Sequence, residues 1–597
     1  MGRLWWPIVL FILVIVCSIS ANAWKTIEIN QNLAKCIQSM IRNDNATPIK
    51  YILISTETDS KSEKLKFLEI VDQLLASNDL DVVFEIDNKN PDKILEFPVH
   101  RRILFVDSVK SFRRLIDYQR SHTNDVSGNF QYFYVILPSN VDDLEYIVQQ
   151  ITAFCLANMI ADVNILVSNT EGCVTIYSYY PFTPGNCRNS KPVIENYYKN
   201  GSFKWIKAVF PLKLMNLWQC PLSVIVWDES PFIINAKKPD RRSGVDIEFL
   251  NFFKNNMNVT WNFINIESGP GEIYSNGTIS KGFKMLNERR GDLMACGSVL
   301  DSKRISRFAA TQFYYGKSAR IILKPPEKYG PLSVLLFPFD KFTWLIVFLV
   351  IVGKWNFEAL WNRISKKLYF SKRLSLKALM PVWLLGVLII RSSYEGSLYK
   401  YLHDNPLKKL PQNLNEAITD GYTLIVQKNF YYNYGQKLLM EIDKSSILLI
   451  DLPIEEIHKY FTKIKNGKYT LLSSGDYLAG YRSHKSPLRE KYQSLIVSDE
   501  VILMFYTGIY MPKFSFLTAV LNKQIACIYS SGLAIKVHRD IILNEMKRRK
   551  FIAGRNLPVK MSTEHFFGAF QILAGMLVIA GCVFLIEIVS VRNRTTK

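Results

Sequence analysis

The sequence contains few of the residues that form most catalytic and metal sites. Its 597 residues include seven histidines and nine cysteines. There is no His-Glu-x-x-His motif, no Gly-x-Ser-x-Gly motif and no phosphate-binding glycine loop, and the cysteines lack zinc-type spacing. We therefore expect no catalytic residue, no metal and no cofactor, which leaves a membrane-anchored enzyme as a remote alternative.

Acidic residues are also scarce, with 52 Asp and Glu against 74 Lys and Arg, a net charge of +22. Such an excess can indicate nucleic-acid binding. However, residues 354–380 hold seven basic residues and one acidic residue between two apolar segments, and the tail from Arg592 adds three more basic residues. This bias is typical of cytoplasmic loops of membrane proteins, so we expect no nucleic-acid partner.

The N-terminus has the pattern of a secretory signal. Arg3 precedes an apolar run from Ile8 to Cys17, and Ala21-Asn22-Ala23 follows as a small-x-small cleavage site. We predict a signal peptide over residues 1–23. A retained anchor is the alternative, although the run is short for a span, which needs about 20 residues.

Three uncharged apolar segments are candidates for membrane spans: residues 342–353, 378–390 and 566–586. The last is long enough to cross the membrane; the first two, taken alone, could be buried core helices. The basic loop between them favours spans, with the N-terminus outside and the C-terminus in the cytoplasm. The Asn-x-Ser/Thr sequons upstream of the first span agree with this topology and are predicted glycosylation sites: Asn45, Asn200, Asn258 and Asn276.

The outer regions read as α/β structure interrupted by the membrane segments. Residues 24–212 alternate strand-like and helical stretches, and residues from Cys220 to Met294 read as βαβ units, which bind ligands at their strand ends. We predict an α/β binding unit split by a membrane insertion. The domains are a signal peptide at 1–23, an N-terminal extracellular domain at 24–212, ligand-binding segments at 213–338 and 403–562, a membrane domain at 339–402, a last span at 563–590 and a cytoplasmic tail at 591–597.

Seven cysteines lie in the predicted extracellular part, an oxidising environment in which some should pair. Cys173 and Cys187 enclose a short segment with Pro181, Pro184 and Gly185, which favours a turn between them. We predict a Cys173–Cys187 disulfide, and the odd total leaves one cysteine unpaired or bonded between chains.

The sequence resembles the ionotropic glutamate receptor superfamily, and more closely its insect chemosensory branch, the ionotropic receptors, as a divergent taste-type member. The resemblance covers about residues 213–590. It rests on Cys220-Pro221-Leu222, Gly291-Asp292-Leu293, the segment Ser393-Tyr394-Glu395-Gly396-Ser397-Leu398 after a hydrophobic helix, and Gly508 to Lys513. It implies a periplasmic-binding-protein-like, bilobed clamshell, three transmembrane helices and a re-entrant pore loop.

The same resemblance implies the site residues. Ser393, Tyr394, Glu395 and Ser397 fall in the gate sequence, and Arg304 falls where the family has the arginine that binds the ligand carboxylate. Ser298 and Asp301 lie in the same ligand-binding stretch. Glu395 either faces the pore or pairs with Arg391 one turn earlier.

Two departures from the family pattern limit the function. Gly297-Ser298-Val299 replaces the family's Pro-Leu-Thr and removes a hydroxyl that binds the amino group, so glutamate recognition is not expected. Asp499 and Glu500 are only loosely placed as an acidic partner for that group. Basic residues interrupt the pore-loop region, so the loop is degenerate, which favours dependence on partner subunits.

The sequence thus predicts a chemosensory, ligand-gated cation channel subunit for taste or smell. Its expected partners are a small non-glutamate ligand, co-receptor subunits in a hetero-tetramer, permeant cations and membrane lipid. Its expected location is the plasma membrane, in the dendrites of sensory neurons. The alternative is a non-conducting ligand-binding or scaffold subunit.

Overall fold

The computed structural model describes residues 27–44, 50–76, 82–87, 101–122, 132–139, 143–267, 269–274, 276–350, 352, 373–403, 406–452, 454–464, 467–481, 494–540 and 563–595. The predicted signal peptide, the sequon at Asn45 and residues 356–372 of the pore loop expected over 356–380 lie outside the described residues, whereas residues 373–380 of that loop belong to a helix. The chain divides into two compact units. The first comprises residues 1–319, 474–487 and 503–545, and the second comprises residues 320–473, 488–502 and 546–597.

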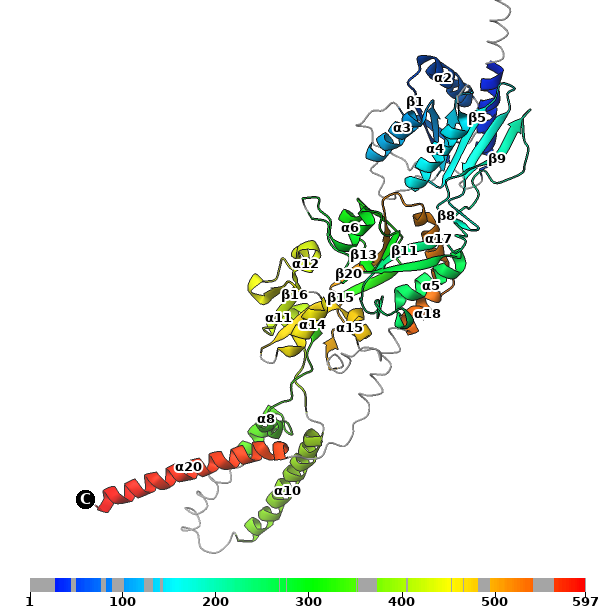
Figure 1. The fold of residues 1–597 in the computed structure, drawn as a ribbon. Coiled ribbons are helices and arrows are strands. Elements are labelled where there is room, and N and C mark those ends of the chain that lie inside the picture. The colour runs from blue at the N-terminus through cyan, green and yellow to red at the C-terminus, as the bar shows by residue number, and fades with distance from the viewer. Residues whose placement is uncertain are drawn as a thin grey trace, which may run out of the picture. The chain divides into compact units, whose positions relative to one another are not determined.

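The first unit begins with an eight-stranded N-terminal sheet in the order β10-β9-β6-β5-β4-β3-β1-β2 (Figure 1). Pairing is parallel from β2 to β5 and antiparallel from β5 to β10. The central strands β3 and β4 are almost wholly buried, as expected for parallel strands with both faces covered. Their bounds and those of their neighbours are β1 Lys50–Glu57, β2 Val82–Ile86, β3 Arg101–Val106, β4 Tyr132–Leu137, β5 Asp162–Ser168, β6 Val174–Tyr179, β9 Pro192–Lys199 and β10 Ser202–Phe203.

Helices cover this sheet because each presents an apolar stripe to it. In α2, Phe67, Ile70, Val71 and Leu74 are buried, a spacing of three and four residues that places them on one face. Ser60 begins this helix, and its side chain accepts a hydrogen bond from the N–H of Glu63. The helices are residues 27–42, α2 Lys61–Leu75, α3 Val109–His122 and α4 Leu144–Ala157.

The second part of the first unit contains the first-lobe sheet, with strand order β12-β11-β13-β20-β15. Strands β12, β11 and β13 are parallel, and β20 is antiparallel to both β13 and β15. The strands are β11 Pro221–Val226, β12 Thr260–Asn265, β13 Leu293–Val299, β14 Ala309–Ala310, β15 Tyr315–Leu323 and β20 Leu503–Met511. The helices are α5 Val245–Met257, α6 Lys281–Asn287, α7 Ser302–Ile305, α15 Gly475–Tyr481, α17 Leu517–Ser530 and α18 Leu533–His538.

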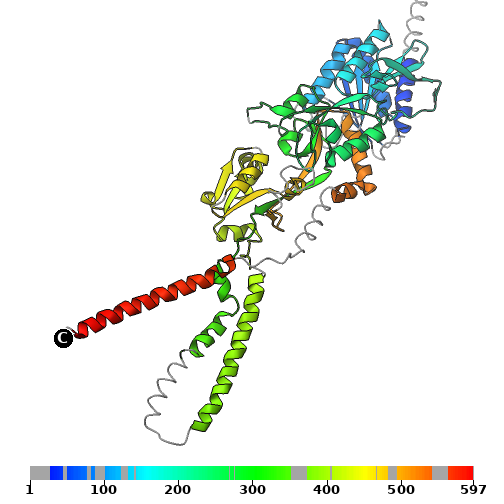
Figure 2. The ribbon, with the colours of Figure 1, turned by 60° about the horizontal axis from the view of Figure 1, so that its bottom comes forward.

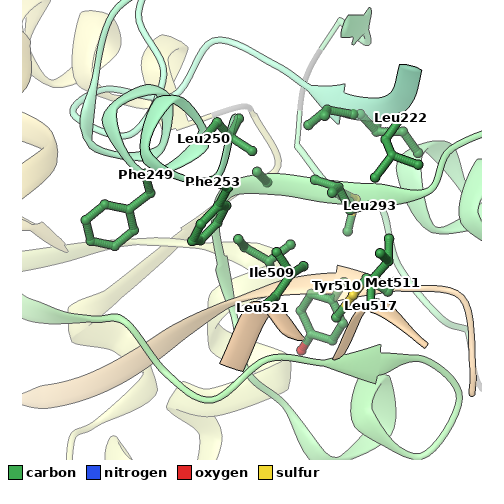
Figure 3. Packing of buried hydrophobic residues seen from close by; sticks show 14 of the residues in the cluster. Leu222, Phe249, Leu250, Phe253, Leu293, Ile509, Tyr510, Met511, Leu517 and Leu521 are labelled. Atoms are coloured by element: carbon green, nitrogen blue, oxygen red, sulfur yellow. The ribbon is translucent and has the colours of Figure 1, made fainter. Parts of the chain in front are cut away.

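The first-lobe core forms between this sheet and its helices (Figure 3). Leu250 and Phe253 of α5 face Leu293 and Ile509 of the sheet, and Leu517 and Leu521 of α17 join the same cluster. These residues come from segments more than 200 positions apart. The core therefore unites two chain segments that are far apart in the sequence.

The N-terminal sheet is joined to the first lobe by covalent, apolar and charged contacts. Cys187 forms a disulfide with Cys220. Phe182 packs edge-on against Phe516, with the ring centroids 6.1 Å apart, within the range of about 4.5–7 Å that is usual for aromatic pairs. The guanidinium of Arg188 lies 2.7 Å from the carboxylate of Asp292, which also accepts the N–H of Ser223 at the start of β11.

The disulfide corrects the predicted Cys173–Cys187 pair, which was wrong. Cys173 lies just before β6, and that extended strand of six residues carries the chain about 20 Å away from it. The short hairpin of β7 Phe182–Thr183 and β8 Asn186–Cys187 does not return the chain to Cys173 but brings Cys187 to the start of β11. Cys173 is a free thiol in the structure.

The second unit contains the end of β15 and a small α/β layer with strand order β15-β18-β16-β17. Asn413 begins α11, and its side chain accepts the N–H of Glu416 at 2.7 Å. The strands are β16 Thr423–Gln427, β17 Ile447–Ile450, β18 Tyr469–Ser474 and β19 Ile496–Val497. The helices are α8 Pro331–Leu336, α10 Arg373–His403, α11 Leu414–Thr419, α12 Lys428–Phe430, α13 Gln436–Leu438, α14 Ile454–Lys463 and α20 Thr563–Thr595.

Among the described residues, one helix is long and apolar enough to cross a membrane, at Phe567–Val589 within α20. Figure 2 shows α10 and α20 as two separate, continuous helices. The helix Lys341–Val350 is apolar but short, and the apolar part of α10 lies between charged residues at Lys377 and Arg391. The structure thus has the expected α/β class with two mixed sheets, consistent with a bilobed binding-protein-like domain, and one of the three predicted spans.

The cysteine pairing gives a first prediction. Replacing Cys187 with serine should lower the thermal unfolding temperature of the full chain, because a loop of 33 residues is worth about 3–4 kcal/mol of chain entropy when closed. Peptide mapping under non-reducing conditions should recover Cys187 linked to Cys220. A peptide linking Cys173 to Cys187 would contradict the structure, and Cys173→Ser is the matched control.

Candidate ligand-binding site

A buried carboxylate joins the elements on which the predicted ligand residues lie. Asp246, the second residue of α5, is 2% exposed. One of its oxygens accepts the N–H of Gly297 in β13, and the other accepts the hydroxyl of Tyr314 just before β15, both at 2.8 Å. Burial raises the pKa of Asp246 to about 6, and the two hydrogen bonds oppose that shift. One side chain thereby fixes helix α5 to two strands of the first-lobe sheet.

Glycine is required at position 297. Its φ is +55°, in the left-handed region, and an added Cβ would lie 2.5 Å from Cγ of Phe232. The pairing of β13 with β20 is irregular between Met294 and Ser298, which places the Gly297 N–H toward Asp246 and not in the strand ladder. Gly297 begins the stretch Gly297-Ser298-Val299, which stands where the family has Pro-Leu-Thr. Because glycine has no side chain, the ring of Phe232 can pack directly against the backbone there.

A second charged cluster lies at the carboxyl end of β11. The ammonium group of Lys317 in β15 lies 2.6 Å from the carboxylate of Glu229, which also accepts the indole N–H of Trp227 at 2.8 Å. Lys317 is 9% exposed and sits 4.2 Å from the centre of the Phe232 ring. The ion pair is thus held beside two aromatic side chains, Phe232 and Trp227.

The sequence prediction did not include Glu229 and Lys317. They are 88 positions apart, so no local spacing connects them. The one available signal was the sequence Trp227-Asp228-Glu229 directly after a predicted strand, since ligands bind beyond the carboxyl ends of parallel strands.

Arg304 lies in the short helix α7 beyond the carboxyl end of β13. One guanidinium N–H group donates to the carbonyl of Val299 at 3.2 Å, and the guanidinium carbon stands 5.1 Å from the centre of the Phe283 ring. Within the described part of the chain these are the two contacts of the guanidinium group, so most of its N–H groups do not donate to protein acceptors. Because β11 and β13 are parallel neighbours, Arg304 and Glu229 follow strand ends at the same edge of the sheet.

Asp301 and Ser298 have different surroundings. Asp301 begins α7, and its main-chain N–H donates to the hydroxyl of Tyr510, which in turn donates to the carbonyl of Val299. Ser298 is buried, and its hydroxyl has no hydrogen-bond partner among the described residues. Asp301 and Arg304 are thus tied to the same carbonyl, whereas Ser298 is part of the strand core.

In the second unit, Glu500 has a structural partner. Its carboxylate accepts the N–H of Leu414 at 2.7 Å, at the N-terminus of α11, where a negative charge is favourable. The main-chain carbonyl of Asp499 accepts a guanidinium N–H of Arg320 at 2.9 Å. These contacts give the two acidic residues structural roles in the second unit.

The four predicted gate residues lie together in the last three turns of α10. The hydroxyl of Tyr394 donates to the carbonyl of Leu335 in α8 at 3.0 Å, and its ring packs against Phe339 and Trp344. Glu395 forms an ion pair with Arg391 at 2.8 Å, one of the two arrangements expected for it. Ser393 and Ser397 lie on the same helix, with Ser393 exposed and Ser397 half-buried.

The described sequons occupy turns or helix ends. Asn200 and Asn276 are exposed, and Asn276 accepts hydrogen bonds from the N–H and hydroxyl of Thr278. Asn258 ends α5 and donates to the side chain of Asn216 at 3.1 Å. Glycosylation at these positions stays a prediction.

The fold defines the class as an α/β protein consistent with a bilobed binding-protein-like domain, with one helix that is long and apolar enough to cross a membrane. Residues 25–216 match the family model described as "Putative ionotropic receptor, ligand binding domain". The match confirms the similarity to ionotropic receptors for residues 25–216, all of which precede the motifs from Cys220 onward that first indicated it. Ionotropic receptors are typically channels and not enzymes. No curated protein matches the chain.

The buried Asp246 gives a prediction for pH. A carboxyl group whose pKa is raised in the folded state binds its proton more tightly there. Its contribution to the free energy of unfolding is therefore present below pH 3.8 and is lost as the pH rises toward about 6. The unfolding temperature of Asp246→Asn minus that of the wild type should therefore be larger at pH 7 than at pH 4.5.

Thermal unfolding of both chains at the two pH values measures this difference. Asp499→Asn is the matched control, since the exposed Asp499 is held through its main chain. A temperature difference between the wild type and Asp246→Asn that is the same at both pH values would contradict the buried-carboxylate assignment.

Proposed function

We propose that the protein is a chemosensory ligand-gated cation channel subunit that responds to a small non-glutamate ligand. The match of residues 25–216 to an ionotropic-receptor ligand-binding domain carries this proposal. The apolar helix at Phe567–Val589 and the gate-like sequence in α10 support a membrane-bound receptor. In this proposal the helix Lys341–Val350 and the apolar part of α10 supply two further spans.

The ligand would bind in the first lobe beside Arg304. A guanidinium group that makes one hydrogen bond to a protein carbonyl retains donors for a ligand carboxylate, which it can bind through two parallel bonds. Asp301 holds the position of α7 and Ser298 belongs to the supporting strand. The Phe232 ring lies against Gly297, in the stretch with which the family binds the amino group of its ligand, and leaves less space there. This favours a ligand that is not an α-amino acid.

Gating would draw its energy from the ligand. A ligand shifts a conformational equilibrium only by the difference between its affinities for the two states. In the proposed hetero-tetramer with co-receptor subunits, that difference would act on α10, with Ser393, Tyr394 and Ser397 in the gate. We place the receptor in the plasma membrane of sensory dendrites, with the sequons and the residue ranges 24–338 and 403–562 outside.

The alternative is a non-conducting ligand-binding or scaffold subunit, favoured by the basic residues in the expected pore-loop region. Recordings of ligand-evoked current from cells with and without candidate co-receptors distinguish the channel subunit from the scaffold subunit. Ligand-evoked cation current in the presence of a co-receptor supports the channel subunit. Silence in both conditions, with the chain present at the cell surface, supports the scaffold.

The role of Arg304 is tested on the ligand response. Arg304→Ala should raise the half-maximal concentration of a carboxylate ligand at least about tenfold, because a charge-assisted pair is lost. Dose–response currents from cells that express the chain with a co-receptor provide the measurement. Lys303→Ala is the matched control on the same helix and should leave the response unchanged. An acid response that survives Arg304→Ala unaltered would refute the carboxylate role.

The role of Glu395 is tested on ion selectivity. Because Arg391 occupies its carboxylate, we expect Glu395→Gln to leave the cation selectivity and the open probability close to wild type. Reversal potentials in sodium and calcium solutions measure selectivity, and Tyr394→Ala serves as the positive control for a gate defect. A changed reversal potential in Glu395→Gln would show instead that the carboxylate faces the permeating ions.

A further inference from the structure

The first unit contains a cavity of about 200 Å³ away from Arg304. It lies between the N-terminal sheet, the segment over residues 210–215 and the start of α17. Its walls are mostly apolar and include Phe210, Leu212, Phe516 and Val520. Ala519 and Lys523 also line it and are exposed, so the cavity can be reached from solvent.

One carboxylate in this cavity has unused acceptors. Asp162, the first residue of β5, lines the cavity, and among the described residues no hydrogen-bond donor or ion-pair partner contacts its carboxylate. Burial raises the pKa of Asp162 to about 6, and the charges of Lys213 and Arg101 oppose that rise. At neutral pH the group is therefore mainly ionised and able to accept hydrogen bonds.

The nearby cations have other partners. The ammonium group of buried Lys213 donates to the carbonyl of Ala161 at 2.9 Å and to the hydroxyl of Ser178 at 2.8 Å. Arg101 pairs with Asp44 at 2.5 Å. Lys213 therefore attracts the charge of Asp162 electrostatically, but it donates its hydrogen bonds to other acceptors.

The lining of the cavity contains groups of both charges. A charged ligand of either sign would meet one attractive and at least one repulsive group, because Asp162, Lys213 and Lys523 all line the cavity. A neutral molecule that donates one hydroxyl hydrogen meets no charge repulsion, brings no charge out of water and can use the free acceptors of Asp162. The aromatic side chains favour a flat apolar body.

The size of the cavity limits that body. A cavity of about 150 Å³ holds benzene, so about 200 Å³ suits a single substituted ring. We propose that this cavity is a second ligand site, which binds small neutral phenols or aromatic alcohols, with the hydroxyl donating to Asp162 and the ring against Phe210 and Phe516.

The site lies where the two parts of the first unit meet. Residues 210–215 lead from the N-terminal sheet toward β11, and Phe516 also packs on Phe182 near the Cys187–Cys220 bond. A bound phenol would stabilise this junction by mass action. The site is independent of the ligand position proposed beside Arg304.

Calorimetric titration of the full chain in lipid nanodiscs tests the proposal, with 4-ethylphenol and ethylbenzene as probes that differ by one hydroxyl. Both probes partition into lipid, so the binding signal is the difference between the wild type and Ala519→Trp, which fills the cavity mouth. Ala526→Trp, on an exposed position of the same helix outside the cavity, is the matched control.

We expect the wild type and Ala526→Trp to bind 4-ethylphenol at least about tenfold more tightly than ethylbenzene, because the hydrogen bond to a carboxylate is charge-assisted. Asp162→Asn should reduce this ratio to about threefold or less, and wild-type affinity for 4-ethylphenol should fall from pH 7.5 to pH 5. Arg304→Ala should bind as the wild type does.

Three results would overturn the proposal. Unchanged heats in Ala519→Trp would place the probes outside the cavity. If Asp162→Asn still bound 4-ethylphenol at least about tenfold more tightly than ethylbenzene, the hydroxyl would not donate to Asp162. Tighter binding of 4-ethylbenzylamine than of 4-ethylphenol would refute the selection for a neutral ligand.

Discussion

The first lobe depends on the hydrogen bonds of one buried carboxylate. Asp246 has its charge in an apolar core, an arrangement that is tolerated only when donors satisfy it. The donors are the Gly297 N–H in β13 and the Tyr314 hydroxyl just before β15. The position of α5, the irregular pairing of β13 and the start of β15 follow from this contact. Through β15 and the end of β13 it also determines where Lys317 and Arg304 lie.

A second constraint acts between the N-terminal sheet and the first lobe. The Cys187–Cys220 bond joins the β7–β8 hairpin to the beginning of β11, and Arg188 next to it pairs with Asp292 at the beginning of β13. The family match covers the N-terminal sheet and ends at residue 216, just before this lobe begins. A sequence similar to a receptor ligand-binding domain is thus covalently fixed to the first lobe, and the cavity around Asp162 lies at that contact.

The differences between prediction and structure have one physical origin. The Cys173–Cys187 prediction used only the turn residues between the two cysteines and ignored the direction of β6, which separates them. Glu229 and Lys317 were missed because an ion pair across a sheet leaves no spacing in the sequence. Arg304 was found because a family pattern placed it, but its contacts with Val299 and Phe283 required the positions of a strand end and of α6.

Several features of this protein follow from local composition alone. These are the apolar helix within α20, the α/β alternation and the resemblance to ionotropic receptors. They could be predicted because hydropathy, helix periodicity and short motifs are properties of neighbouring residues. Tertiary structure alone decided the partner of Cys187, the donors to Asp246, the pair Lys317–Glu229 and the free acceptors of Asp162. Each depends on which distant segments the core brings within about 3 Å, because hydrogen bonds, ion pairs and desolvation act only at contact distance.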